Sequence, residues 1–159
     1  MYTFSPAGFD DLDAVFALID RRILWLQQRN DHLWDAYREV YPDDYFRTLV
    51  QKGRLYLLKA GEDIAAMISL WDSDEKWTDG APALYLHNLA AEERFPGAGA
   101  EILQRCALEA RRLDRDRLRL DCTALNPRLN DYYEGQGFAY VATCPGDIYY
   151  TPNLREKVL

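Results

Sequence analysis

Apolar positions near the N-terminus recur with the period of a helix. After a short strand expected at residues 2–4, apolar side chains return at intervals of three and four from Leu12 to Leu26. This spacing predicts an amphipathic helix, and two aspartates just before it supply the acidic first turn that favours a helix start. A shorter helix is predicted over residues 43–51, and Lys52-Gly53 closes it.

The middle of the chain carries short apolar runs of the kind found in strands. Runs at residues 55–58 and 64–70 flank Gly61-Glu62-Asp63, which is typical of a β-hairpin. The polar segment 71–82 contains glycine and proline and is predicted to be a loop. A further strand is expected over residues 83–91.

Helical and strand patterns alternate in the C-terminal half. Apolar residues from Ile102 to Leu113 have helical spacing, and a glycine-containing turn separates them from the strand before. The later expected elements are a strand at 118–122, a helix at 126–136 ended by Gly137, and two strands at 138–141 and 148–150. The order β-α-α-β-β-β-α-β-α-β-β predicts an α/β fold with a mixed sheet rather than a doubly wound parallel one.

Length and composition favour one compact domain over residues 1–159, because the chain has 159 residues and is 48% hydrophobic. No apolar stretch is long enough to cross a bilayer, and the N-terminus lacks the pattern of a signal peptide. We therefore expect a cytoplasmic protein with no membrane partner.

The net charge of −7 disfavours nucleic acid or an anionic membrane as a partner, because both need basic patches. It is compatible with a cationic small substrate.

The cysteines Cys106, Cys122 and Cys144 are odd in number and form no CxxC or Cys/His cluster, so free thiols are expected and neither a disulfide framework nor a metal site is indicated.

The turn before the central helix contains Gly97 and Gly99. The first N–H groups of a helix lack intrahelical partners, and glycines let a phosphate approach them closely. The turn lacks the GxxxxGK[ST] of a P-loop, and its surroundings lack the full GxGxxG of a dinucleotide fold. Taken alone, it is equally well explained as a helix start after Pro96.

Two motifs in order make this turn more specific. Arg94-Phe95-Pro96-Gly97-Ala98-Gly99 fits the pattern [Gln/Arg]-x-x-Gly-x-[Gly/Ala], and Asn126 leads a helix ending in Tyr133-Glu134-x-x-Gly137-Phe138. Both resemble signatures of the GNAT superfamily of acyl-CoA N-acyltransferases. The resemblance implies a mixed, mostly antiparallel central sheet flanked by helices on both faces, with acetyl-CoA as co-substrate and no metal.

The turn is shorter than in many members of that superfamily, so its two glycines are a firmer part of the motif than Arg94. Three acidic residues, Glu92, Glu93 and Glu101, also lie near the turn, and they would weaken phosphate binding unless they point to solvent.

The resemblance also implies a set of cofactor contacts. They are the turn residues Arg94, Phe95, Gly97, Ala98, Gly99 and Ala100, the strand residues Leu89, Ala90 and Ala91, and the helix residues Asn126 and Tyr133. The Ala90 and Ala91 N–H groups are the implied oxyanion donors. Asn126 also suits an N-cap ahead of Pro127.

The resemblance assigns two residues to proton transfer. Tyr133 is the expected acid for the departing thiolate, because a phenol is protonated at neutral pH, although packing against the sheet would also explain it. His87 is the expected general base. A water chain ending at Glu92 or Asp121 would serve equally, and His87 could be an ordinary half-buried strand histidine.

The acceptor side is expected to include Trp25, Trp34 and His87, whose rings could hold a cation. Core packing of Trp25 is the rival explanation.

The predicted function is acetyl transfer to a primary amine of a small molecule, directly within a ternary complex. The alternatives are a non-catalytic acyl-CoA-binding module and a structural protein with no ligand. The sequence does not fix the oligomeric state, although exposed strand edges near the C-terminus are compatible with a homodimer.

Overall fold

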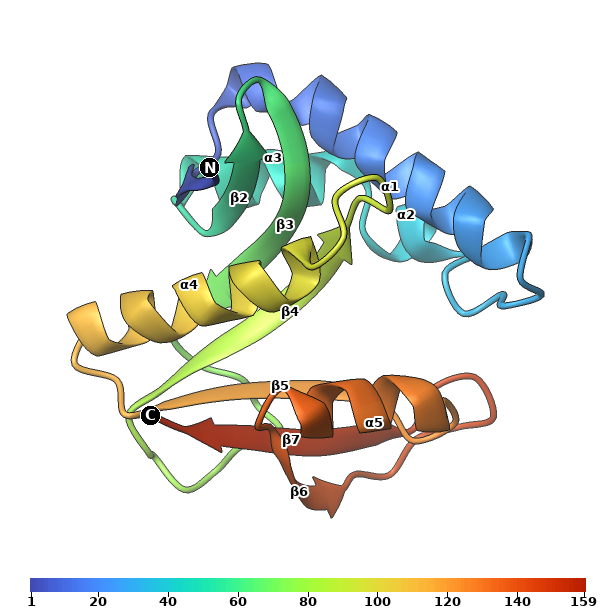
Figure 1. Ribbon diagram of the computed structural model, residues 1–159. Helices are drawn as coiled ribbons and strands as arrows, with labels where there is room; N and C mark the ends of the chain where they lie inside the picture. The colour runs from blue at the N-terminus through green and yellow to red at the C-terminus, as the bar shows by residue number, and fades with distance from the viewer. The chain divides into compact units, whose positions relative to one another are not determined.

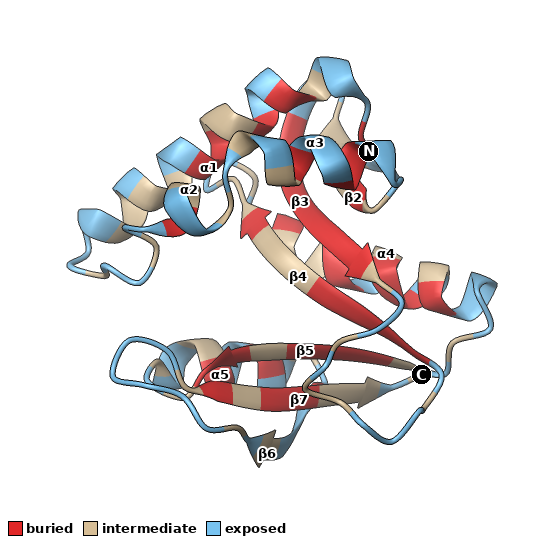
Figure 2. Cartoon of the chain, turned by 180° about the vertical axis from the view of Figure 1, so that it is seen from behind, coloured by how far each residue is buried: buried red, intermediate tan, exposed pale blue.

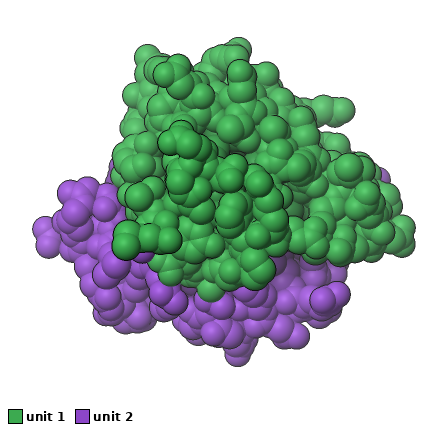
Figure 3. Space-filling view, turned by 45° about the horizontal axis from the view of Figure 1, so that its top comes forward, with its two compact units in different colours: residues 1–69, 88–102 green, residues 70–87, 103–159 purple.

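The computed structural model describes residues 1–159, which divide into two compact units (Figure 3). Unit 1 comprises residues 1–69 and 88–102, and unit 2 comprises residues 70–87 and 103–159. The boundaries fall inside strands β3 and β4 and helix α4. Both units therefore combine helices with strands.

Unit 1 contains most of the N-terminal elements (Figure 1). They are β1 (Thr3–Pro6), the 3₁₀ turn η1 (Phe9–Asp11), α1 (Leu12–Gln27), α2 (Tyr37–Val40), α3 (Asp43–Gln51), β2 (Leu55–Ala60), most of β3 (Asp63–Trp71), the end of β4 (Ala83–Ala91) and the start of α4 (Ala98–Arg112). The Asp11 carboxylate accepts a hydrogen bond from the Gly8 N–H at 2.8 Å just before α1. Gly53, at φ +64, ends α3 as expected.

The core of unit 1 follows from these patterns. Helix α1 buries Leu12, Val15, Leu18 and Ile19, which lie on one face at helical spacing. Helix α3 contacts both α1 and β2. Figure 2 shows β3 buried along nearly its whole length, because its residues from Ile64 to Leu70 are apolar or small.

Unit 2 contains the start of β4, the rest of α4 and the C-terminal elements. These are β5 (Arg117–Thr123), α5 (Pro127–Gly135), β6 (Ala139–Thr143) and β7 (Pro152–Val158). Strands β4 and β5 are parallel, with Leu84 opposite Leu118 and Tyr85 opposite Arg119. Helix α5 contacts β5 and β6.

The strands form a seven-stranded sheet in the order β1-β2-β3-β4-β5-β7-β6. The pairs β1–β2, β2–β3, β5–β7 and β6–β7 are antiparallel, and β4–β5 is parallel. This confirms the predicted mixed, mostly antiparallel sheet flanked by helices. No helix combines the length and the apolar character that crossing a bilayer requires.

Most predicted elements are confirmed, and α3 and β4 have the predicted bounds. The last strand was predicted wrongly at 148–150. That segment is a loop in which the Asp147 carboxylate accepts hydrogen bonds from the N–H groups of Tyr149 and Tyr150, at 2.7 and 2.8 Å. The last strand is β7, whose charged residues hide it from a hydrophobicity pattern. The short helix α2 was not predicted.

Buried Arg155 explains how a charged sequence forms β7. Its guanidinium donates to the Phe138 carbonyl oxygen at 2.8 Å and to the Asn130 side-chain oxygen at 3.2 Å, and it pairs with Glu134 at 3.1 Å. A charged group inside a fold is tolerated when its donors are satisfied in this way.

The predicted free cysteines are also confirmed: Cys106 and Cys122 are buried, and Cys144 is partly exposed.

Gly137, which follows α5, is expected to accept a side chain only at a cost in stability. Its φ is +88, and a Cβ there would lie 3.3 Å from Cε of Lys157. Gly137→Ala should therefore lower the free energy of unfolding by about 1–2 kcal/mol in urea denaturation. Gly135→Ala is the matched control, because a Cβ at this helical position meets no atom within 4 Å. Equal losses in the two variants would contradict this account.

Candidate functional site

The turn between β4 and α4, in unit 1, leads directly into a helix N-terminus. Strand β4 ends at Ala91, the Phe95 N–H donates to the Glu92 carbonyl oxygen at 3.1 Å, and α4 begins at Ala98. Gly97 precedes the helix with φ +84, a left-handed conformation that glycine adopts at little steric cost. The backbone conformation therefore explains why this position is a glycine.

The first turn of α4 presents unused backbone donors. The Glu101 N–H donates to the Gly97 carbonyl oxygen at 3.0 Å and starts the helical hydrogen-bond series. The N–H groups of Gly99 and Ala100 come before it, so they have no intrahelical acceptor. Together with the positive end of the helix dipole, these groups suit an anion.

Charged side chains around the turn pair with one another. The Glu92 carboxylate lies 2.6 Å from the Arg21 guanidinium, and the Glu93 carboxylate lies 3.6 Å from that of Arg29. Two of the acids that could repel a phosphate are thus compensated by arginines, one within α1 and one just beyond its C-terminal end. Arg94 pairs with Asp63 at 3.1 Å. The predicted phosphate-binding arginine is therefore engaged by the β2–β3 hairpin.

A small open pocket lies beside the end of β4. Helix α1 and residues 91–93 line it, and Trp25 forms part of its wall. The guanidinium carbons of Arg22 and Arg29 lie 4.1 and 3.7 Å from the Trp25 ring centroid. The indole Nε1 is buried without a hydrogen-bond partner. Trp25 thus contributes to a pocket wall as well as packing against arginines.

Trp34 belongs to a row of aromatic rings in the same unit. It stacks on Tyr37 with ring centroids 4.3 Å apart, and the row continues through Tyr41 to Tyr45 with centroids 4.9 and 4.8 Å apart. This arrangement supplies aromatic surface where the sequence analysis placed the acceptor side.

Asn88, which the sequence analysis missed, ties this aromatic row to β4. Its side-chain oxygen accepts hydrogen bonds from the Tyr45 hydroxyl at 2.7 Å and the Ser69 hydroxyl at 2.8 Å, and its amide donates to the Tyr37 hydroxyl at 2.9 Å. Its φ is +59. Asparagine tolerates this conformation better than most residues, so an asparagine inside a strand pattern was the available signal.

His87, in unit 2, is held by a carboxylate. Its Nε2 lies 2.9 Å from Oδ2 of Asp74, whose side chain is only 7% exposed. The hydrogen bond from His87 is the largest cause that lowers the pKa of Asp74 to about 2, and Lys76 contributes as well. Asp74 was also missed, because it lies in a segment predicted only as a polar loop.

Lys76 neutralises the carboxylates around His87. Its Nζ lies 3.7 Å from Asp74 and 3.5 Å from Asp121, and the Tyr150 hydroxyl donates to Asp121 at 2.6 Å. Asp74, His87 and Asp121 have possible ligand atoms within 4.8 Å of one another. The protein's own ammonium already lies within ion-pair distance of both carboxylates, so this cluster gives no reason to invoke a metal ion.

Helix α5 carries the second motif. Asn126 is its N-cap, since its side-chain oxygen accepts a hydrogen bond from the Leu129 N–H at 3.1 Å, and Pro127 begins the helix. Tyr133 is 8% exposed and its ring lies edge-on to Phe138. Burial raises the pKa of Tyr133 above its ordinary value, so the phenol keeps its proton at neutral pH.

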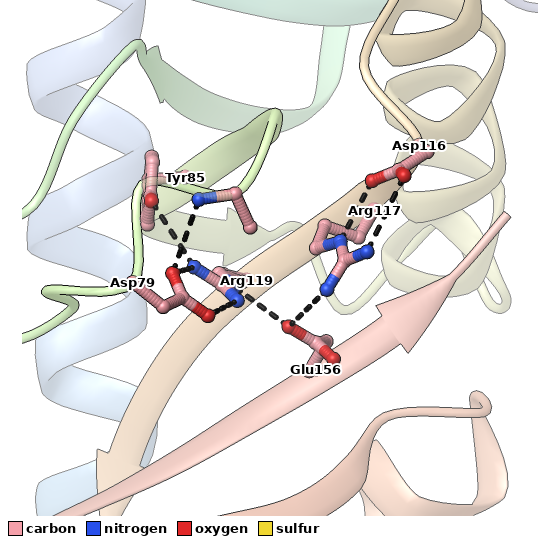
Figure 4. Close-up of polar contacts among 7 residues, drawn as sticks. Asp79, Tyr85, Asp116, Arg117, Arg119 and Glu156 are labelled. Carbon is pink, nitrogen blue, oxygen red and sulfur yellow. Dashed lines mark hydrogen bonds and ion pairs between the residues drawn. The ribbon is translucent and has the colours of Figure 1, made fainter.

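Arg119, on β5, is the most completely buried charged side chain of unit 2. Figure 4 shows its polar contacts. Its two terminal nitrogens donate to the Asp79 carboxylate at 2.7 and 2.6 Å, and its Nε donates to Glu156 at 2.7 Å. The Tyr85 hydroxyl accepts at 3.3 Å, and the Trp77 ring centroid lies 4.2 Å from the guanidinium. An arginine within an alternating strand was the only sequence signal for this cluster.

The predicted site residues are distributed over both units. Unit 1 contains Trp25, Trp34, Leu89, Ala90, Ala91 and the turn residues 94–100, and unit 2 contains His87, Asn126 and Tyr133. A model of the Acetyltransferase (GNAT) family matches residues 23–138, more than half of the chain, and this segment includes all of them. The chain belongs to the GNAT acetyltransferase family. It is thus a member of a family of acyltransferases that use acetyl-CoA.

Similar proteins agree with this assignment. The chain is 28% identical over 145 residues to the uncharacterized N-acetyltransferase YesJ of Bacillus subtilis (strain 168), covering 86% of this chain and 81% of YesJ. A GNAT-family acetyltransferase from Listeria monocytogenes has a TM-score of 0.82 at 18% identity, covering 99% and 95% of the two chains. The PaiA N-acetyltransferase from Thermoplasma acidophilum, solved with coenzyme A, has a TM-score of 0.78 at 14% identity, covering 100% and 99%. These two structures share the fold of this GNAT chain.

The Asp74 carboxylate should make the stability of this GNAT protein depend on acid. Its pKa is lowered in the folded state from 3.8 to about 2, so its stabilising effect is complete above the unfolded-state pKa and is lost as the pH falls toward 2. Asp74→Asn should unfold at lower urea concentration than the unmodified protein at neutral pH. The difference should shrink as the pH falls below about 4. A difference that stays constant over this range would contradict the assignment.

Proposed function

We propose that this GNAT protein transfers the acetyl group of acetyl-CoA directly to a primary amine of a small acceptor, within a ternary complex. The observation that carries the proposal is the start of α4, where Gly97 is left-handed and the Gly99 and Ala100 N–H groups have no intrahelical acceptor. Phosphate oxygens accept hydrogen bonds from such groups. A Cβ at Gly97 would meet no atom within 4 Å, so the need for glycine there is conformational.

The cofactor contacts follow the order of the chain. The pyrophosphate binds the turn residues 94–100, with the glycine-turn amides as its principal donors. Arg94 adds charge only if it leaves Asp63. The backbone of Leu89, Ala90 and Ala91 offers hydrogen bonds to the pantetheine amides and to the developing oxyanion, and Asn126 contacts the pantetheine arm.

The proton transfers use groups whose protonation states suit them. Acetyl-CoA supplies the thioester, and the leaving thiolate must receive a proton. Tyr133 holds one, because burial raises the pKa of its phenol. His87 accepts a proton from the attacking amine, and its imidazole is oriented by Asp74. The acids of the alternative water relay, Glu92 and Asp121, are each engaged by a side-chain partner.

The acceptor is proposed to be a small amine that meets Trp25 and Trp34 as well as His87. Aromatic faces favour cations, and the net charge of −7 over the whole protein is compatible with a cationic substrate. The Trp25 pocket and the aromatic row from Trp34 to Tyr45 support an acceptor with an organic ammonium group.

Gly97→Ala is expected to weaken acetyl-CoA binding about tenfold in isothermal titration calorimetry. A left-handed non-glycine residue costs about 1–2 kcal/mol, and relief of that strain moves the first amides of α4. Gly61→Ala is the matched control, since its φ is +63 in the β2–β3 turn and its Cβ also meets no atom within 4 Å. Equal acetyl-CoA affinity in the two variants would argue against the turn as the phosphate site.

Tyr133→Phe is expected to lower kcat about 100-fold and to leave acetyl-CoA affinity nearly unchanged, because only the proton donor is lost. The measurement is thiol release from acetyl-CoA with polyamines, amino acids, aminoglycosides and peptide N-termini as acceptors. Tyr132→Phe, at the neighbouring half-exposed tyrosine, should retain nearly full activity. Acetyl-CoA binding without thiol release from any amine would instead support a non-catalytic acyl-CoA-binding module.

A further inference from the structure

The loop between β3 and β4, residues 72–82, is held by side chains at several points within unit 2. Asp74 bonds His87, Lys76 pairs with Asp121, and the Trp77 ring lies against the Arg119 guanidinium. A polar loop of this length has many conformations, and each bond to the sheet removes some of them.

Arg119 holds the loop through two of its residues, Asp79 and Trp77. Its side chain is 2% exposed, and the two carboxylates bonded to it come from the loop (Asp79) and from β7 (Glu156). The paired hydrogen bonds to Asp79 fix the direction of that carboxylate, as Figure 4 shows. They also hold the pKa of Asp79 far below its usual range. The Ala81 N–H donates to the same carboxylate at 3.2 Å, which orders the end of the loop.

The other end of the loop determines the state of His87. A neutral imidazole carries one N–H and one lone pair. Because Nε2 lies 2.9 Å from the Asp74 carboxylate, which can only accept, Nε2 carries the hydrogen and Nδ1 carries the lone pair. The Trp71 ring stands edge-on to the imidazole at 6.2 Å and further limits its rotation. Asp74 thus selects both the tautomer and the orientation of the ring.

We propose that Asp74 is a positioning residue for His87. We also propose that Arg119 affects the same histidine indirectly, because it holds the loop through Asp79 and Trp77. The catalytic meaning of this inference rests on the proposed function, in which His87 is the base. The structural part, that the loop sets the His87 tautomer, can be measured without turnover.

The first experiment uses nitrogen NMR of the imidazoles at a pH where they are neutral. The chain has two histidines, so His32→Gln assigns the signals of His87. The unmodified protein should show the hydrogen on Nε2, and Asp74→Ala and Asp79→Ala should both give a mixture of tautomers. Asp79→Asn keeps one acceptor oxygen for Arg119, so its proportion of the two tautomers should lie between those of the unmodified protein and Asp79→Ala. If Asp79→Ala does not fold, Asp79→Asn decides the outcome. His87 signals unchanged by the Asp74 or the Asp79 substitutions would overturn the proposal.

The second experiment measures acetyl transfer to the panel amine that releases thiol fastest. Asp74→Ala should lower kcat about tenfold or more and Asp79→Ala about threefold, with the KM for acetyl-CoA within about twofold, because orientation of the base rather than cofactor binding is lost. Glu75→Ala removes an exposed carboxylate of the same loop and should stay within about twofold.

The two proposals fail in different ways. Absence of thiol release by the unmodified protein with every amine contradicts the proposed function, and the NMR result then decides the positioning proposal alone. A kcat that falls in His87→Ala but not in Asp74→Ala overturns the positioning proposal and leaves the proposed function standing.

Discussion

A guanidinium buried on a central strand has to be neutralised, and the way this chain meets that requirement organises much of unit 2. Arg119 draws Asp79 from the loop at 72–82 and Glu156 from β7, and the Trp77 ring covers it. Breaking a buried pair by removing one partner leaves an uncompensated charge, which is far more costly than losing a surface ion pair. The loop is therefore held to β5, and the Asp74 carboxylate of this loop lies beside His87.

A comparable constraint operates in unit 1 around Asn88. Its left-handed backbone interrupts the regular alternation of β4, and its amide uses both oxygen and nitrogen to bind hydroxyls from α2, α3 and β3. Three hydrogen bonds offset the cost of a strained conformation inside a strand. Strain of this kind commonly occurs at functional sites, and here it lies immediately before the strand residues that we propose to contact the pantetheine arm.

Burial and charge pairing place two key groups in opposite protonation states. Tyr133 stays protonated because its phenolate would be desolvated, whereas Asp74 stays ionised because His87 and Lys76 stabilise its charge. One group therefore has a proton to give, and the other can only accept a hydrogen bond. Both protonation states agree with the proton transfers proposed for Tyr133 and His87.

Local patterns determined a large part of this structure. The N-cap at Asn126, the end of α3 and the left-handed Gly97 depend on neighbours within a few residues, and each was predictable from the sequence. The bounds of β4 were also predictable, because its apolar run stands between a polar loop and a glycine turn. The roles of Asp74, Asn88 and Arg119 were decided only by tertiary structure, as was β7. Arg119 and Asp79 are 40 positions apart, and Arg155 in β7 depends on Asn130, 25 positions away. Periodicity reports which side chains prefer burial, but a buried charge is stable only beside partners that the fold brings to it.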